Sequence, residues 1–399
     1  MLRSKFRLEK SKEASSNHNP DFMLDNFVEA EVKSVLWPLY VVQWLSLAPK
    51  YSIRYGLITS NSYKFNVIVF LCAVGIGITW FSSVLGYLTR ADGIYAVTLF
   101  AYSVTLVFAI ILNSFITTSH SNMNAHLIVL IQRIQKRFMF VKFDNRGIAI
   151  INWVFLMVII AYNIAHFTTR LLESRVLITI VFTHFIYLSI DCNSIVAIRM
   201  IHLLGKLIDT WISELKYFSR TNCNDTEPKD YFNKLILAYD ELMEALKISD
   251  KIFRLPIFFT VLASFFHVFV NVQAALSVSY SNIEISNLLI YLPVWTKSMY
   301  VAQLIWVKNL TIVAILCMES EIIQLKVRNA QVACIVLSAR ETATEMSKLM
   351  RRQEPWARSK RGAGWLRAAG LFPVDAALPP RFLDVLATYV IVILQYHFL

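Results

Sequence analysis

The chain closes on Ala387-Thr388-Tyr389-Val390-Ile391-Val392-Ile393-Leu394-Gln395-Tyr396, an apolar stretch that contains a single amide. Its composition predicts a membrane-spanning helix. An unpaired amide in lipid costs several kcal/mol, so the face that carries Gln395 is expected to turn toward protein or water. Neighbours three, four and seven positions apart share a helix face, so Thr388, Ile391 and Gln395 lie together and Val392 lies beside them.

The overall composition is also that of a membrane protein. Apolar residues make up 56% of the chain and charged residues 17%, whereas about 25% of a soluble domain is charged. Seven segments have the ~20 mainly apolar residues that a helix needs to cross a bilayer: residues 65–88, 94–118, 147–167, 176–203, 255–280, 285–318 and 382–398. We therefore predict an all-α protein with seven transmembrane helices. A shorter apolar segment, residues 35–49, predicts a helix that lies in the membrane interface or extends the first span.

The basic residues are distributed very unevenly over the predicted connections. The N-terminal segment and the three connections on the same side of the membrane contain 29 lysines and arginines, whereas the opposite side contains only Arg90, Arg170 and Arg175. Basic connections face the cytoplasm. The sequence therefore predicts a cytoplasmic N-terminus and an outer C-terminus, and anionic lipid and cytosol account for the net charge of +12 without nucleic acid.

Two of the long inner connections have the apolar periodicity of helices. In residues 235–248, apolar residues recur at i, i+3, i+4 and i+7, and residues 319–350 carry one stripe. The members of that stripe are Ile323, Val327, Ala330, Ala333 and Val336. These helices either lie on the membrane surface or bundle below it, where they would also join subunits. The continuous apolar stripe favours the bundle.

The sequence contains no motif typical of an enzyme. We find no phosphate-binding loop, no nucleotide fingerprint and no histidine or cysteine spacing typical of a metal site. The expectation is a protein that is not an enzyme and holds no cofactor and no metal.

Charged residues inside predicted spans are expensive and normally face a cavity or a partner. Asp191 lies about 22 Å below the outer start of the fourth span, and Lys297 about 18 Å below that of the sixth. Their similar depth and opposite sign predict an ion pair, which either fastens two helices or lines a ligand or ion cavity. Arg199 and Lys308 are placed near the inner membrane edge, where they can extend to the interface.

Aromatic and polar residues gather in the outer halves of the spans. Candidates for a pocket between helices, together with the charged pair, are Tyr102, Tyr162, His166, Tyr187, Asn271 and Trp295. Tyr162 and His166 are i, i+4 neighbours and share a face. Ordinary helix packing explains any one of these residues, but as a set they indicate a site for a small amphipathic ligand.

The terminal stretch resembles the Thr-Tyr-(five apolar)-Gln-Phe signature that closes insect gustatory receptors, with Tyr396 in place of Phe. Upstream, Ala369-Gly370-Leu371-Phe372-Pro373-Val374-Asp375 is similar to the Gly-Leu-Phe-x-x-Asp run of the same family. The short connection at residues 171–175 is more typical of gustatory than of odorant receptors. Val390 stands where sugar receptors of the family tend to carry an acid, which favours a bitter or other non-sugar class.

The resemblance implies a ligand-gated, non-selective cation channel in the plasma membrane of sensory neurons. Its implied partners are a small-molecule tastant, monovalent and divalent cations and membrane lipid. Four like or unlike receptor subunits would meet at an anchor formed by the inner helices, and the last helix of each would line the pore with Thr388, Ile391, Val392 and Gln395.

These expectations divide the chain into four parts. Residues 1–64 form the cytoplasmic N-terminus with the interfacial helix, residues 65–318 the first six spans with their inner extensions, residues 319–380 the inner loop and anchor helix, and residues 381–399 the pore helix. The composition of residues 353–380 differs from that of their surroundings, as a native variation or a mis-joined exon. A secondary transporter that uses Asp191 and Lys297 is the main alternative, and a non-signalling scaffold for other receptors is a second.

Overall fold

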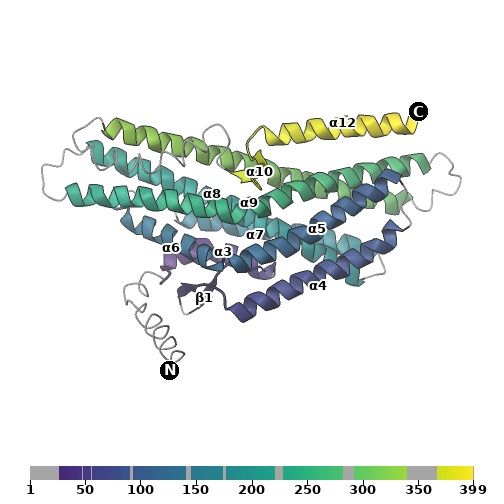
Figure 1. Ribbon diagram of the computed structural model, residues 1–399, viewed down its shortest axis with the longest axis horizontal. Helices are drawn as coiled ribbons and strands as arrows, with labels where there is room; N and C mark the ends of the chain where they lie inside the picture. Colours follow the sequence, from purple (N-terminus) through teal and green to yellow (C-terminus); the bar gives the residue numbers. More distant parts are fainter. Residues whose placement is uncertain are drawn as a thin grey trace, which may run out of the picture.

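The computed structural model describes residues 27–46, 48–54, 56–89, 93–140, 145–173, 177–220, 228–281, 292–338 and 366–398. The helices are α3 (Ala30–Leu45), α4 (Tyr63–Leu88), α5 (Gly93–Ser119), α6 (Ser121–Arg137), α7 (Asn145–Glu173), α8 (Leu177–Arg220), α9 (Pro228–Ser281), α10 (Leu292–Ser338) and α12 (Leu378–Phe398). Two small antiparallel hairpins pair β1 (Ser52–Arg54) with β2 (Leu57–Thr59) and β3 (Arg367–Ala368) with β4 (Phe372–Pro373). The longer helices run roughly along the long axis of the molecule (Figure 1).

The predicted all-α membrane fold is confirmed. Each of the seven predicted spans falls largely within one helix, namely α4, α5, α7, α8, α9, α10 and α12. In the described part of the chain, five stretches are long and apolar enough to cross a bilayer, and they lie in α4, α5, α7, α8 and α9. The protein is therefore a multi-pass membrane protein.

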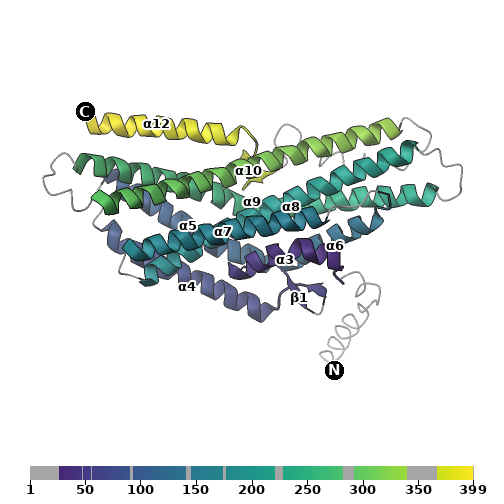
Figure 2. The same ribbon diagram turned by 180° about the vertical axis from the view of Figure 1, so that it is seen from behind.

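Helices α8, α9 and α10 are much longer than a bilayer requires. They contain 44, 54 and 47 residues, which is about 65–80 Å at 1.5 Å per residue, whereas the hydrocarbon core is about 30 Å thick. The end of α8, the start of α9 and the end of α10 lie together at one end of the molecule (Figures 1 and 2). The three helices therefore continue well beyond the membrane core at this end of the molecule.

These extensions pack against one another as a bundle. Trp211 of α8 packs against Tyr239 of α9 with ring centroids 5.0 Å apart and the rings tilted by 38°, and its indole N–H donates to the Leu235 carbonyl at 2.9 Å. The apolar positions of residues 235–248, apart from the exposed Leu237, are buried in the same core as Ile323, Val327 and Ala330 of α10. This burial favours the bundle over helices that lie on the membrane surface. Val336 and residues 339–350 contribute no described side chain.

The short apolar segment near the N-terminus is a helix, α3, which buries Val35, Leu36 and Leu39 in the main core. It packs along α7 and α8. Just after it, Lys50 is almost fully buried, and its ammonium lies 5.0 Å from the ring centroid of Phe253 on α9. The Lys50 Nζ atom has no hydrogen-bond partner among the described residues.

The Gly-Leu-Phe run forms the turn and second strand of the β3–β4 hairpin. Ala369 and Gly370 take φ angles of 49° and 78° in the turn, a left-handed conformation that glycine adopts without strain. The Ala369 N–H donates to the Arg254 carbonyl of α9 at 3.3 Å, and the Ala376 N–H donates to Glu321 Oε2 of α10 at 3.2 Å. The hairpin is thus held by α9, and the segment that follows it is held by α10, immediately before α12 begins.

Helix α12 lies along the outside of the bundle, and its C-terminal end is at the same end of the molecule as the end of α9 (Figures 1 and 2). Phe382 meets Phe265 of α9 edge to face, with ring centroids 5.1 Å apart. A small apolar cluster holds α12 in place through Phe382, Leu386 and Tyr389.

Candidate functional site

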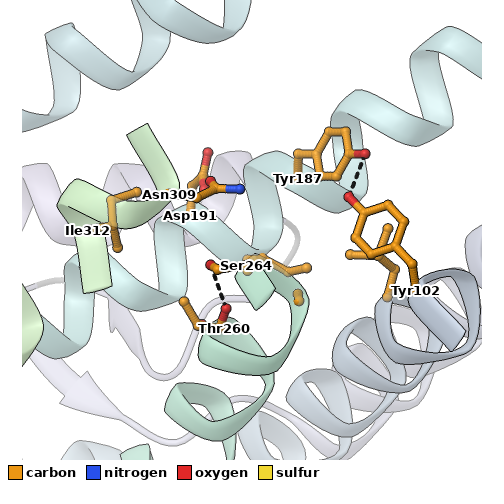
Figure 3. Close-up of a pocket in the computed structure, with 10 residues that line it drawn as sticks. Tyr102, Tyr187, Asp191, Thr260, Ser264, Asn309 and Ile312 are labelled. Atoms are coloured by element: carbon orange, nitrogen blue, oxygen red, sulfur yellow. Dashed lines mark hydrogen bonds between the residues drawn. The ribbon is translucent and has the colours of Figure 1, made fainter. Parts of the chain in front are cut away.

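A narrow cavity lies between α5, α8, α9 and α10, within the part of the bundle that contains the predicted spans (Figure 3). Its polar lining residues are Tyr102, Tyr187, Asp191, Thr260, Ser264 and Asn309, and its apolar ones are Leu106, Ile190, Ala263 and Ile312. The cavity volume is about 20 Å³, enough for about one water molecule. An organic ligand would therefore have to part the helices that form its walls.

A hydroxyl and imidazole network closes one side of this cavity. The Tyr102 hydroxyl lies 2.7 Å from the Tyr187 hydroxyl and 2.8 Å from Nδ1 of His267. A hydroxyl carries one proton, so Tyr102 donates to one of these neighbours and accepts from the other. The network joins α5, α8 and α9 through the buried Tyr102 and His267 and the half-buried Tyr187.

An ion pair closes the other side. The Lys308 ammonium of α10 lies 2.5 Å from Asp191 Oδ2 of α8, and the side chains of Asp191 and Lys308 are only 5% and 16% exposed. The same ammonium lies 5.1 Å from the ring centroid of Tyr162 on α7. The pair therefore ties α8 to α10 directly beside the cavity.

The predicted pairing of Asp191 with Lys297 is wrong, because the partner is Lys308. Lys297 and Lys308 lie about 16 Å apart along α10, so only one of them can lie at the depth of Asp191. Measured from the helix starts, Asp191 lies about 21 Å along α8 and Lys308 about 24 Å along α10, whereas Lys297 lies only about 8 Å along α10. Lys308 is therefore at the depth of Asp191 and does not extend to the interface as expected.

Arg199 also departs from its predicted interfacial role. It is 4% exposed, and its Nε donates to Asn152 Oδ1 at 2.5 Å. Its guanidinium carbon lies 5.5 Å from the ring centroid of Phe155. Arg199 therefore fastens α8 to α7 inside the protein.

Other predicted ligand residues lie behind the cavity wall. Tyr162 and His166 of α7 stack at 6.3 Å, and His166 lies 4.4 Å from His184 and 6.4 Å from Tyr187, measured between ring centroids. Tyr102, Tyr187 and Asp191 line the cavity itself, so the structure brings together three of the predicted residues and places two more in contact with them.

The structure does not confirm three of the predicted ligand residues: Asn271 lies away from the cavity, and the other two have no described side chain. The Asn271 side chain donates to the His267 carbonyl at 2.7 Å, one turn beyond the network. The side chains of Trp295 and Lys297 fall outside the described residues, so their role as ligand residues stays a prediction.

Sequence reasoning missed Thr260, Ser264 and Asn309, and treated His267 as one of several scattered histidines. Thr260 Oγ1 lies 2.8 Å from Ser194 Oγ, and Ser264 Oγ donates to the Thr260 carbonyl at 2.7 Å. Thr260, Ser264 and His267 follow the i, i+4, i+7 spacing of one face of α9. A polar stripe on an otherwise apolar span was the signal that could have found them.

The predicted pore residues share a side of α12 that is open in a single chain. Thr388, Ile391, Val392 and Gln395 are all exposed, and the apolar Ile391 and Val392 are 55% and 54% exposed. This side of the helix makes no close packing with the described remainder of the chain.

Comparison with solved structures identifies the fold of this chain. No protein-family model matches this sequence, and no curated protein matches it. The solved structure of the insect olfactory receptor OR5 from Machilis hrabei is similar at 10% sequence identity and a TM-score of 0.52, over 90% of this chain and 97% of that one. The same receptor in complex with eugenol is similar at 11% identity and a TM-score of 0.52, over 92% and 100%. The chain thus has the fold of an insect olfactory receptor.

Proposed function

We propose that this protein is a gustatory receptor that acts as a ligand-gated, non-selective cation channel. The observation that carries the proposal is the open side of α12: Ile391 and Val392 are more than half exposed, although the helix is otherwise fastened to α9. The fold of an insect olfactory receptor supports it, and the C-terminal signature favours a taste receptor for a bitter or other non-sugar compound.

The open side of α12 suits a pore made by several copies of the helix. Around a central axis, Thr388, Ile391, Val392 and Gln395 would form an apolar constriction with a ring of amides beside it. Apolar constrictions close by dewetting and open when they widen slightly, and the amide ring offers oxygen ligands to monovalent and divalent cations. Residues 381–399 would then be the pore helix of each subunit.

A tetramer would complete this pore, from identical chains or together with other gustatory receptors. The inner ends of α8, α9 and α10 extend far beyond the bilayer core and would supply the anchor between subunits, with residues 319–380 included. With the N-terminus inside, the basic inner connections would face the anionic leaflet of the plasma membrane.

The cavity between α5, α8, α9 and α10 is the proposed ligand site. The structure of the Machilis hrabei receptor is described in complex with eugenol, a small aromatic molecule. The cavity here combines two tyrosine rings with a few polar groups, which is the composition of sites for small amphipathic ligands. Tyr162, His166, Asn271, Trp295 and Lys297 would surround it in the wider pocket.

The decisive experiment is a recording of membrane current. Cells that express the chain, alone and with a second gustatory receptor, are exposed to bitter and sugar compounds while whole-cell current is recorded. We expect a ligand-evoked current that reverses near 0 mV with mixed monovalent cations and persists when Na⁺ is replaced by K⁺ or Ca²⁺. A current of fixed stoichiometry that follows an ion gradient would instead indicate a secondary transporter. The absence of current in either expression condition would contradict the proposal.

A further inference from the structure

We propose that the cavity takes a small organic cation whose ammonium group replaces that of Lys308 at Asp191. The inference rests on the proposed role of this cavity as the ligand site, and it names the chemical class of the ligand. A protonated amine with an aromatic ring fits the two sides of the cavity.

The first argument is which charge faces the cavity. The lining residues include Asp191 but not Lys308. The Lys308 ammonium reaches the carboxylate from the side of Tyr162, whose ring centroid is 5.1 Å away. A charged group that comes from within the cavity therefore meets a carboxylate, which attracts a cation and repels an acid.

The second argument is the shape of the lining. Figure 3 shows Asp191 and Asn309 on one side of the cavity and the rings of Tyr102 and Tyr187 on the other. The carboxylate and the Asn309 amide oxygen can both accept hydrogen bonds from an ammonium group. The tyrosines present aromatic surface to the rest of the ligand.

The third argument is that the exchange keeps the Asp191 carboxylate paired with a cation. A neutral ligand that separates Asp191 from Lys308 leaves two buried charges unpaired, which is strongly unfavourable. An ammonium ligand keeps the carboxylate paired, and the displaced Lys308 retains the face of Tyr162 as a cation–π partner. The cavity should therefore bind an organic cation more tightly than a neutral molecule of the same shape.

The exchange also explains how so small a cavity could admit an organic molecule. The Asp191–Lys308 pair ties α8 to α10, and both helices form walls of the cavity. A ligand ammonium that takes over Asp191 removes this tie and allows the walls to separate. Ligand binding and the parting of α8 from α10 become one event.

The test uses two probes of nearly equal shape, 2-phenylethylamine, which is protonated at neutral pH, and 2-phenylethanol, which is neutral. Binding is measured on the purified full chain in lipid nanodiscs by ligand-dependent thermal stabilisation, and current is recorded separately in cells. We expect the amine to bind the unaltered chain about tenfold or more tightly than the alcohol, as suits a charge-assisted hydrogen bond. Equal binding of the two probes, or no binding of either, would overturn the proposal.

Two substitutions separate the roles of the pair. Asp191→Asn removes the carboxylate and should abolish the preference, so that the amine binds no more tightly than the alcohol. Lys308→Met removes the competing ammonium, so amine binding should tighten by about tenfold or more. If Lys308→Met folds poorly because its Asp191 is unpaired, added amine should restore its surface expression and the alcohol should not. An amine preference that survives Asp191→Asn would contradict the assignment.

The matched control is a second ion pair between the same two helices. Lys326 of α10 lies 2.6 Å from Asp209 of α8, in the inner bundle and away from the cavity. The double substitution Lys326→Met and Asp209→Asn should leave the ratio of amine affinity to alcohol affinity unchanged. Amine-selective binding without current would support the site while contradicting the channel, so the two proposals fail separately.

Discussion

Tyr389 of α12 stacks on Phe269 of α9 with ring centroids 4.0 Å apart and an interplanar angle of 25°. The stack fixes which side of α12 faces its own chain. Ile391, two residues later, lies on another side and is more than half exposed. Tyr389 thus packs against a neighbouring helix, and the remaining face of α12 is the one available to a pore.

The first prediction concerns that open face. Gln395→Ala should change the permeability ratio of Na⁺, K⁺ and Ca²⁺ because it removes an amide from the proposed ring. Ile391→Ser should raise the current without ligand, since a hydroxyl helps water to enter an apolar constriction. Reversal potentials and basal current measure the two effects. The pore face is assigned wrongly if both variants match the unaltered chain while Tyr389→Ala changes permeation.

The second prediction concerns the stack itself. Tyr389→Ala should lower the free energy of unfolding by about 2 kcal/mol, less than the ~3–5 kcal/mol of a fully buried aromatic residue, because the Tyr389 ring is partly exposed. The Tyr389 hydroxyl is buried without a hydrogen-bond partner among the described residues. Tyr389→Phe therefore serves as the control and should retain full surface expression. A loss of expression in the Phe variant would show that the hydroxyl, not the stack, matters.

The third prediction concerns the buried ion pair. Asp191→Asn or Lys308→Met alone should each cost about 3–5 kcal/mol, because each leaves one buried charge without a partner. The double variant should recover most of that loss, which thermal unfolding in detergent can measure. Removing the exposed pair Lys136–Glu29, 3.2 Å apart, should cost only about 0–1 kcal/mol. A Lys297→Met variant that behaves like Lys308→Met would contradict the assignment of the partner.

The fourth prediction concerns Lys50, which lies outside the predicted spans. Burial lowers the pKa of Lys50 from 10.5 to about 8. Between these two values the unfolded chain binds a proton that the folded chain has lost. The free energy of unfolding should therefore rise as the pH increases through this window, and the full penalty applies below about pH 8.

Replacing Lys50 tests this directly. Lys50→Met should stabilise the protein at pH 7 by on the order of 3 kcal/mol and remove its contribution to the rise in stability between pH 8 and 10.5. Lys64→Met, at an exposed position of α4, is the control and should leave the pH profile unchanged. An unaltered profile for Lys50→Met would mean that the ammonium has a partner that balances its burial.

The fifth prediction concerns orientation and rests on the asymmetry of the basic residues. A tag at the N-terminus should be hidden from antibody in intact cells, and a tag after Leu399 should be accessible. Detergent permeabilisation should expose both tags and is the control. Glycosylation of Asn224, in the sequon Asn224-Asp225-Thr226 of a predicted inner connection, would contradict this orientation.

The sequence predicted the helices well because a lipid-spanning segment can be identified from its length and its apolar composition alone. Residues 65–88 of the prediction correspond to α4, and the periodicity of residues 235–248 correctly indicated a helix with one buried stripe. These features depend on local sequence, in which the 3.6-residue period of a helix is directly visible.

The ion pair could not be predicted in the same way, because it depends on how two helices are offset along the membrane normal. Hydropathy marks an apolar segment but not its offset against a neighbouring helix, and the partner of Asp191 is Lys308 rather than the predicted Lys297. Sequence analysis likewise identified Tyr102 and Tyr187 as candidates but not the hydrogen bond between them. Contacts between residues far apart in the chain depend on packing that composition does not encode.

The β3–β4 hairpin and the residues after it attach the start of α12 to two other helices. Its turn is held by the Arg254 carbonyl of α9, and the chain just after it is held by the Glu321 carboxylate of α10. Both helices also form walls of the cavity, through Thr260 and Asn309. A movement of α9 relative to α10 at the cavity would therefore be passed through these two hydrogen bonds to the start of α12, which connects the proposed ligand site to the proposed pore.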